Sequence, residues 1–147
     1  MKEIFINLTN HPSAMWGADQ KMAAQKYGRI VDLEFPQVPA AADEGYVNKL
    51  VRKYYRMIRD TAERQGGGDW KKDTTVLLQG EFTFTCQLAG RLRAEGIPVL
   101  SACSERTAEE QTGPDGVSAK RSWFRFVRFR AYAYKQRRKL GTGFFTA

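Results

Sequence analysis

The stretch LLQGEFTFT (residues 77–85) contains the end of one structural element and the start of another. Its two leucines end the short apolar run TTVLL (residues 74–78), which predicts a strand buried on both faces. The polar segment QGE follows, and a helix begins after it whose inner face carries Phe84, Leu88 and Leu92. A buried strand that leads through a polar joint into a helix is typical of an α/β sheet with parallel strands.

The N-terminal part of the chain repeats this unit. IFINL (residues 4–8) predicts a central strand, because its residues are apolar almost without interruption. Residues 16–27 carry apolar side chains at helical spacing, and Gly28 is placed to end that helix as a left-handed cap. In RIVDLEF (residues 29–35) apolar and charged residues alternate, which predicts a strand at or near the edge of the sheet.

The remaining elements follow in the same order. A long amphipathic helix is expected from about residue 44 to 64. Gly96 should end the helix that begins after the QGE joint, and IPVLSAC (residues 97–103) predicts a fourth strand. GPDG (residues 113–116) is typical of a turn, and SWFRFVRFRAYAY (residues 122–134) predicts a long aromatic strand.

These alternating patterns predict one α/β fold. We expect an open, doubly wound, Rossmann-like sheet that is mostly parallel, with strand order 2-1-3-4 and an antiparallel C-terminal strand beyond the fourth. A chain of 147 residues is the size of one domain, which we place at residues 1–140, with a C-terminal tail at 141–147.

The positive charge of the chain is concentrated near its C-terminus. The net charge is +8, and no acidic residue follows Asp115, whereas nine lysines and arginines lie between residues 120 and 139. Such a segment suggests a polyanionic partner, although it can equally serve as a solvated edge strand and tail. Because aromatic residues are interleaved with Arg125, Arg128 and Arg130, the segment could bind RNA by backbone neutralisation and base stacking.

The sequence gives no sign of a membrane segment, a disulfide or a metal site. No run approaches about 18 apolar residues, and the N-terminus turns polar too early for a signal peptide, so we expect a cytoplasmic protein. Cys86 and Cys103 lack a CxxC spacing and lie in apolar contexts, where a free cysteine behaves as a small hydrophobic residue, so a disulfide or a zinc site is not expected. Clusters of histidine or carboxylate are missing, and we expect neither a metal nor a cofactor.

In a sheet of this type, ligands bind at the carboxyl ends of the strands where the strand order reverses, here between the first and third strands. Polar clusters follow the first, third and fourth strands. Their candidate ligand-binding residues are Asn7, Thr9, Asn10, Ser13, Gln79, Gly80, Phe82, Thr83 and Ser104. Gly80 would let the backbone approach a ligand, and the free amides of residues 81–84 at the helix start would suit a phosphate.

Three residues of these clusters are candidates for catalysis: His11, Glu81 and Arg106. His11 is the only histidine and could act as a general acid or base, or equally as a donor that stabilises its loop. Glu81 in the first turn of a helix is favourable through the helix dipole alone, and Thr83, Asn10 and Ser13 are ordinary capping residues. The sequence contains no GxxxxGKS, GxGxxG, GxSxG or HExxH motif.

Four segments, spread over most of the chain, resemble a known group of proteins: FINLTNHPS (5–13), QKYGRIVDLEFPQV (25–38), LLQGEFTFTCQLAGRLRAEGIPVLSACSER (77–106) and FRFVRFRAY (124–132). They are similar to small CRISPR-associated Rossmann-type proteins, the CARF domains and the stand-alone ring nucleases. The resemblance implies a homodimer that senses or cleaves a cyclic oligoadenylate in a pocket on its two-fold axis.

The same resemblance implies a mechanism. Ring nucleases cleave without a metal, by placing a ribose 2′-hydroxyl in line with the adjacent phosphate. Asn10 and Ser13 would then orient ribose and phosphate, amides near Gly80 would hold phosphate, Arg106 would neutralise charge and His11 would be an optional acid or base. Two alternatives stay open: an RNA-binding module, and a small enzyme acting on a nucleoside or sugar phosphate with Glu81 or Glu105 as nucleophile or base.

Overall fold

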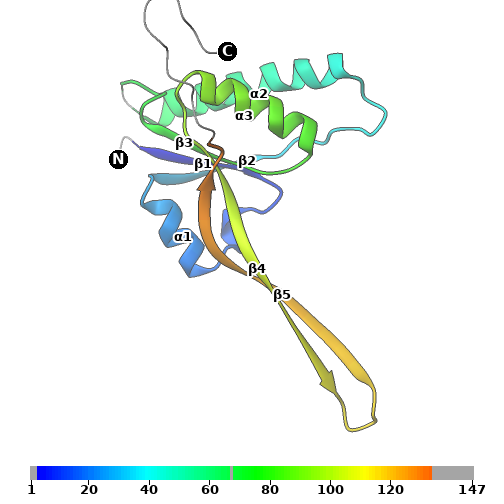
Figure 1. Cartoon of the computed structure of the whole chain (residues 1–147). Coiled ribbons are helices and arrows are strands. Elements are labelled where there is room, and N and C mark those ends of the chain that lie inside the picture. The colour runs from blue at the N-terminus through cyan, green and yellow to red at the C-terminus, as the bar shows by residue number, and fades with distance from the viewer. Residues whose placement is uncertain (1–2, 67, 134–147) are drawn as a thin grey trace, which may run out of the picture.

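A computed structural model describes residues 3–66 and 68–133, which form one five-stranded sheet with helices on both faces (Figure 1). The strands lie in the order β2-β1-β3-β4-β5, with β1 to β4 parallel and β5 antiparallel to β4. The predicted fold class, strand order and antiparallel last strand are therefore confirmed. The strands are β1 (Ile4–Thr9), β2 (Arg29–Glu34), β3 (Thr74–Leu78), β4 (Val99–Thr112) and β5 (Ser118–Ala131).

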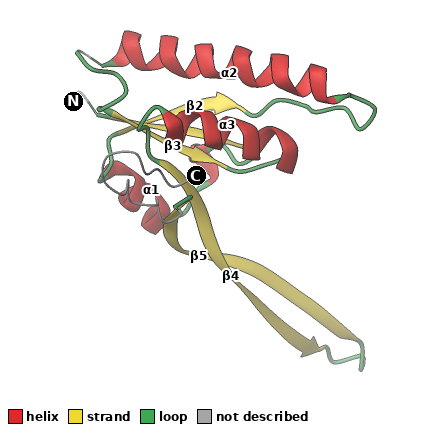
Figure 2. Cartoon of the chain, turned by 45° about the horizontal axis from the view of Figure 1, so that its top comes forward, coloured by secondary structure: helices red, strands yellow, loops and turns green. Residues whose placement is uncertain are grey.

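Within the described residues, three α-helices cover the sheet. The helices are α1 (Ala18–Gln25), α2 (Glu44–Gln65) and α3 (Phe82–Ala94), and a short 3-10 turn, η1, spans Ser13–Met15. Helices α2 and α3 lie on one face and α1 on the other (Figures 1 and 2). Side chains alternate along a strand, so Ile4, Ile6 and Leu8 of β1 pack toward α2 and α3, while Phe5 packs toward α1. This burial on both faces explains the uninterrupted apolar run.

The two glycines that were predicted to cap helices behave differently. Gly96 ends α3 in a left-handed conformation (φ +79°), and the Ile97 amide donates back to the Leu92 carbonyl (3.0 Å), as in a Schellman cap. Gly28 does not cap α1, which ends three residues earlier, and its φ of +153° is a positive value that residues with a side chain rarely adopt. A side chain there would place Cβ 2.5 Å from the Glu3 carbonyl, so the glycine permits close backbone approach to the N-terminal end of β1.

The first helix is also shorter than its periodicity suggested. Trp16 precedes α1 because its amide closes the 3-10 turn by donating to the Ser13 carbonyl (3.1 Å), and its own backbone is extended (ψ 151°). Gly17, which is also extended, is the N-cap of the helix. The Trp16 ring instead packs on Phe5 and Phe129 in the core between the sheet and α1.

The largest departure from the sequence prediction is the length of the last two strands. β4 was expected to end at residue 103 and β5 to begin at 122, but the strands pair from Leu100↔Ala131 to Thr112↔Ser118. We call residues 104–126 the arm, and the rest of the described chain the body. The arm leaves the body as a two-stranded ribbon (Figures 1 and 2), and the predicted GPDG turn forms its tip. SERTAEEQ lacks the apolar alternation of a half-buried strand, which is why it looked like a loop.

Some predictions concern residues outside the described ranges. The tail at 141–147, the domain boundary at 140 and the basic residues between 135 and 139 lie beyond residue 133. Within the part of the chain that the structure describes, no helix is long and apolar enough to cross a membrane.

Candidate functional site

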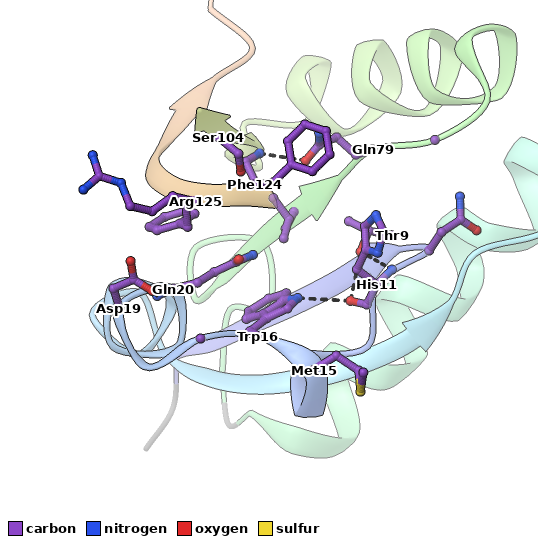
Figure 3. Close-up of a pocket in the computed structure, with 16 residues that line it drawn as sticks. Thr9, His11, Met15, Trp16, Asp19, Gln20, Gln79, Ser104, Phe124 and Arg125 are labelled. Carbon is purple, nitrogen blue, oxygen red and sulfur yellow. Dashed lines mark hydrogen bonds between the residues drawn. The ribbon is translucent and has the colours of Figure 1, made fainter. Parts of the chain in front are cut away.

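A cavity of about 820 Å³ lies at the carboxyl ends of β1 and β3, where the strand order reverses (Figure 3). Its walls come from the loop after β1, the start of α1, the end of β3 and the base of the arm. The structure brings together six of the predicted residues on these walls: Thr9, Asn10, His11, Gln79, Gly80 and Ser104. Three separate segments of the chain therefore converge on one cavity, as the topology predicts.

The cavity forms where β3 and β4 separate. Their ladder consists of Val76↔Val99 and Leu77↔Leu100, after which β3 ends and β4 continues into the arm. Gln79 bridges the resulting gap, since its side-chain Oε1 accepts a hydrogen bond from the amide of Ala102 (2.8 Å). This bond orients Gln79 so that its amide nitrogen is available as a donor at the cavity wall.

A buried hydrogen-bond network shapes the loop after β1. Asn7 donates through Nδ2 to the His11 carbonyl and to Asp32 of β2 (both 2.9 Å), and Thr9 donates to Asn7 Oδ1 (2.9 Å). The Trp16 indole also donates to the His11 carbonyl (3.1 Å). The His11 amide also donates to the Thr9 hydroxyl (3.1 Å), so the backbone of His11 is held by the side chains of Asn7, Thr9 and Trp16, while its own side chain is exposed at the cavity.

Two residues predicted to bind ligand serve this scaffold instead. Asn7 is 1% exposed and does not line the cavity. Ser13 is likewise outside it, because its hydroxyl donates to Asp32 (2.9 Å) and its amide also points to that carboxylate (3.2 Å). Asp32 was not singled out from the sequence. Its only signal was a carboxylate on the strand that pairs with β1, opposite Asn7.

The structure gives a different reason for a glycine at position 80 from the predicted one. A Cβ at this position would lie 2.1 Å from the ring of Phe35, which packs edge-on against Phe84. Phe35 is a buried member of the core beneath α2 and α3. The missing side chain therefore makes room for the core, although Gly80 also lines the cavity.

The start of α3 is occupied by its own cap. Glu81 is the N-cap, and its carboxylate accepts hydrogen bonds from the amides of Thr83 and Phe84 and from the Thr83 hydroxyl. The hydrogen bond from the Thr83 hydroxyl is the main cause that lowers the pKa of Glu81. The prediction that amides of residues 81–84 are free for phosphate was wrong for Thr83 and Phe84. Neither Glu81 nor Thr83 lines the cavity.

The positive charge at the cavity comes from a different arginine than predicted. Arg106 lies in the arm opposite Phe124 and does not line the cavity, because the SACSER segment continues as a strand rather than forming a loop. Arg125 lines it instead, and its guanidinium forms an ion pair with the carboxylate of Glu105 (3.2 Å). Sequence reasoning had assigned Arg125 only to the RNA alternative. Asp19 supplies the carboxylate of the cavity wall.

Sequence reasoning also missed the aromatic walls. Trp16 was placed on the predicted first helix, and Phe124 and Phe126 on the predicted aromatic strand, yet all three line the cavity. Figure 3 shows Trp16 near His11, and Phe124 beside Ser104 and Gln79 across the space. No sequence signal distinguishes these aromatics from core residues, because their position depends on where the arm leaves the sheet.

A second cavity of about 640 Å³ lies on the α3 side and shares Gln79 and Gly80 with the first. Phe82, the remaining predicted residue, lines this second cavity and is 90% exposed. Tyr132 also lines it, and its hydroxyl donates to the Leu78 carbonyl (2.6 Å), while burial raises its pKa. Cys86 also lines it and is exposed.

The remaining observations concern the predicted RNA-binding arginines of β5 and the expected absence of a metal site. Arg128 donates through Nε to the backbone carbonyl of Phe129 (3.0 Å), and Arg130 lies opposite Ser101. Farther out, Arg121 of β5 is paired with Glu109 of β4. Among residues 3–66 and 68–133, no three His, Cys, Asp or Glu side chains lie close enough together to hold a metal ion.

Comparison with known proteins gives a family and no activity. No curated protein matches the sequence. The model of the uncharacterized protein MJ1673 family matches residues 3–130, which include all of the sheet except its last residue, the three helices that the structure describes and the arm. The chain therefore belongs to the uncharacterized MJ1673 family.

Proposed function

We propose that this chain binds a nucleotide in the cavity between β1, β3 and the arm, and that the ligand is a cyclic oligoadenylate. The observation that carries the proposal is the cavity itself, whose volume of about 820 Å³ falls in the range of about 300–1,000 Å³ that is usual for ligand sites. Its position at the switch point is where this architecture binds nucleotides. The resemblance of four segments to cyclic-oligoadenylate proteins favours that class.

The aromatic walls suit a nucleobase. Trp16 is fixed by its hydrogen bond to the His11 carbonyl and by ring contacts in the core, so it needs no ordering when a ligand binds. Phe124 stands at the base of the arm and is 72% exposed, so it can cover a base on entry. Stacking of a base on an aromatic ring contributes about 1–3 kcal/mol.

The polar walls suit a sugar phosphate. Gln79 and Asn10 offer amide donors and acceptors for ribose hydroxyls, and Arg125 offers a permanent positive charge for phosphate. The Glu81 carboxylate occupies the start of α3, so the amides of Thr83 and Phe84 are not available to bind phosphate. In this proposal Arg125 binds the phosphate instead. Asp19 would repel phosphate and accept from a ribose hydroxyl or an adenine amino group.

A cyclic oligoadenylate carries its own nucleophile. In the reaction we propose, a ribose 2′-oxygen attacks the adjacent phosphorus and the bond from phosphorus to the 5′-oxygen breaks. The 2′-hydroxyl proton goes to His11 and the leaving 5′-oxygen takes a proton from solvent, which leaves a 2′,3′-cyclic phosphate. The scaffold of Asn7, Thr9 and Trp16 would position His11 for this step.

Titration calorimetry with cyclic and linear oligoadenylates, adenosine monophosphate and ribose 5-phosphate tests the ligand. We expect saturable binding of a cyclic oligoadenylate. Arg125→Gln should weaken it by about 10- to 100-fold, since a hydrogen bond to a charged group contributes about 1.5–3 kcal/mol. Arg106→Gln is the matched control, because it removes an arginine from the same ribbon outside the cavity, and it should leave affinity within about twofold.

Failure of every oligoadenylate to bind, or equal losses in the two arginine variants, would overturn the proposed site. Chromatography of the same mixtures separates cleavage from sensing, because ring opening by this route yields 2′,3′-cyclic phosphate ends. His11→Ala should abolish product and retain binding. Cell fractionation would test the cytoplasmic location, which stays a prediction.

The alternatives have less support. Neither Glu81 nor Glu105, the carboxylates suggested for an enzyme acting on a nucleoside or sugar phosphate, lines the cavity. Preferential binding of ribose 5-phosphate in the calorimetry would favour that enzyme. An RNA-binding role for β5 is weakened because acidic residues of β4 face its outer basic residues.

A further inference from the structure

The second cavity lies on the α3 side of the sheet, and of the described residues it shares Gln79 and Gly80 with the first. One of its walls is a single face of α3, because the lining residues from that helix recur at helical spacing: Phe82, Thr85, Cys86, Ala89, Gly90 and Arg93. Ser101 of β4 and Tyr132 also line it. Its volume of about 640 Å³ falls in the range of about 300–1,000 Å³ that is usual for small-molecule sites.

The helical wall of this cavity carries a buried hydroxyl that has no partner. Thr85 is 8% exposed, and among residues 3–66 and 68–133 its Oγ1 is a buried side-chain oxygen without a hydrogen bond. Most buried polar groups are paired, because an unpaired one lowers stability. Threonine in a helix occupies two χ1 rotamers, so rotation of the Thr85 side chain can turn its hydroxyl toward the cavity that the residue lines. The hydroxyl is therefore available to a molecule bound there.

Two further polar side chains reach the cavity from the sheet. The Gln79 side chain offers its amide nitrogen, because its Oε1 already accepts from the Ala102 amide (2.8 Å). Ser101 is half-buried and offers a hydroxyl with two acceptor lone pairs. No carboxylate of the described residues lines the cavity, so a cationic ligand would find no counter-ion there. These groups suit a neutral ligand that both donates and accepts hydrogen bonds.

The rest of the lining is mainly apolar and partly aromatic. Phe82, the first residue of α3, is 90% exposed, so its ring is free to stack on a flat ligand. Tyr132 is half-buried and is fixed by the hydrogen bond from its hydroxyl to the Leu78 carbonyl. Ala89 and Gly90 leave the helix surface between them low. A flexible aliphatic ligand would use this apolar surface and leave the polar side chains unpaired.

We infer that the second cavity is a separate binding site for a neutral, planar heteroaromatic ring of the purine class. The ring stacks on Phe82, and its polar edge is hydrogen-bonded by the Thr85 hydroxyl and the Gln79 amide. Phe82, Thr85 and Gly90 line this cavity and not the first. The inference therefore does not rest on the ligand proposed for the first cavity.

The thiol of Cys86 reports whether the cavity is occupied. It is exposed and its residue lines this cavity, whereas Cys103 lines neither cavity, so the reporter chain carries Cys103→Ser. At a concentration of about four times its Kd, adenine should slow alkylation of Cys86 by a maleimide about fivefold, because only the unoccupied form exposes the thiol. Hexanol, a neutral flexible chain, should leave the rate unchanged. No protection by adenine, or equal protection by hexanol, would overturn the inference.

Filling the cavity tests its location. A Cβ at Gly90 meets no atom within 4 Å, so Gly90→Leu occupies the cavity without disturbing the fold. In this variant adenine should no longer change the alkylation rate of Cys86. Gln87→Leu is the matched control, because it places a leucine on an exposed part of α3 outside both cavities, and it should keep the protection. Protection that persists in Gly90→Leu would place adenine elsewhere. Binding of a cyclic oligoadenylate that depends on Arg125 should be the same in both variants, which separates failure here from failure of the first site.

Two substitutions test the contacts, with affinity read from the concentration of adenine that protects Cys86. Thr85→Val should weaken binding about 2- to 12-fold, since a neutral hydrogen bond contributes about 0.5–1.5 kcal/mol. The free chain should melt at the same or a higher temperature, because the variant removes a buried hydroxyl that has no partner. Phe82→Leu should weaken binding about fivefold or more through the loss of stacking. Unchanged affinity in both variants would overturn the site.

Discussion

The body and the arm belong to one sheet, but their residues differ in exposure to solvent. All residues of β1 and β3 are buried, whereas the strands of the arm are exposed from Ser104 to Thr112 and from Ser118 to Arg125. β5 shows the change within a single strand, because Phe129 is 7% exposed and Phe124 is 72% exposed five residues earlier. The same alternation of aromatic and basic residues therefore forms core at one end and surface at the other.

The difference shows what holds each region. The body is held by packing on both faces of the sheet, so its backbone has little freedom and small changes in shape are costly. The arm is held by its own hydrogen bonds and by cross-strand pairs, which contribute about 0.2–1 kcal/mol each. The cavity lies at the boundary between the two, where the rigid strand ends meet the base of the ribbon.

The largest effect should come from glycine substitution in the two regions. Gly28→Ala combines a positive φ with a Cβ 2.5 Å from the Glu3 backbone, which cannot move without disturbing β1. We expect its free energy of unfolding to fall by about 2–5 kcal/mol. Gly116→Ala at the tip of the arm has a positive φ but no atom within 4 Å, and its effect on the body should be small. Chemical denaturation measures both, and equal losses would break the comparison.

A second pair of glycines sharpens the comparison within the body. Gly80→Ala would push a methyl group into the Phe35 ring and should lower the free energy of unfolding by about 1–3 kcal/mol. Gly90→Ala meets no atom within 4 Å on the exposed side of α3 and should raise it by about 0.5–1 kcal/mol, because alanine favours helix. Thermal unfolding gives both signs. A stabilised Gly80→Ala would mean that Phe35 moves aside easily.

The smallest effect concerns two carboxylates, Glu81 in the body and Glu105 in the arm. Because the folded chain lowers the pKa of Glu81, its charge stabilises the fold above the ordinary pKa of 4.5, and this is lost as the pH falls through the lowered value. The stability deficit of Glu81→Gln should therefore shrink on acidification. Glu105→Gln breaks an exposed ion pair and should cost less than about 1 kcal/mol. Denaturation from neutral pH to pH values below 4.5 tests this, and a deficit for Glu81→Gln that is independent of pH would contradict the capping role.

The candidate site was predictable in its position and less so in its residues. The switch point followed from strand order, and Thr9, Asn10, His11, Gln79 and Ser104 reached it as expected. Asn7 and Ser13 did not, because both bind Asp32, a carboxylate on another strand. In the same way, Arg125 replaced Arg106 because β4 continues past the point where its sequence pattern stops resembling a strand.

The sequence by itself determined the order of strands and helices, because burial imposes a period of two or 3.6 residues on neighbouring side chains, and that period is written in the chain. Only the tertiary structure decided which polar groups line the cavity. Asn7 meets Asp32 across 25 residues and Gln79 meets Ala102 across 23, and Gly80 makes room for Phe35. Such choices depend on contacts between distant segments, and no local pattern records them.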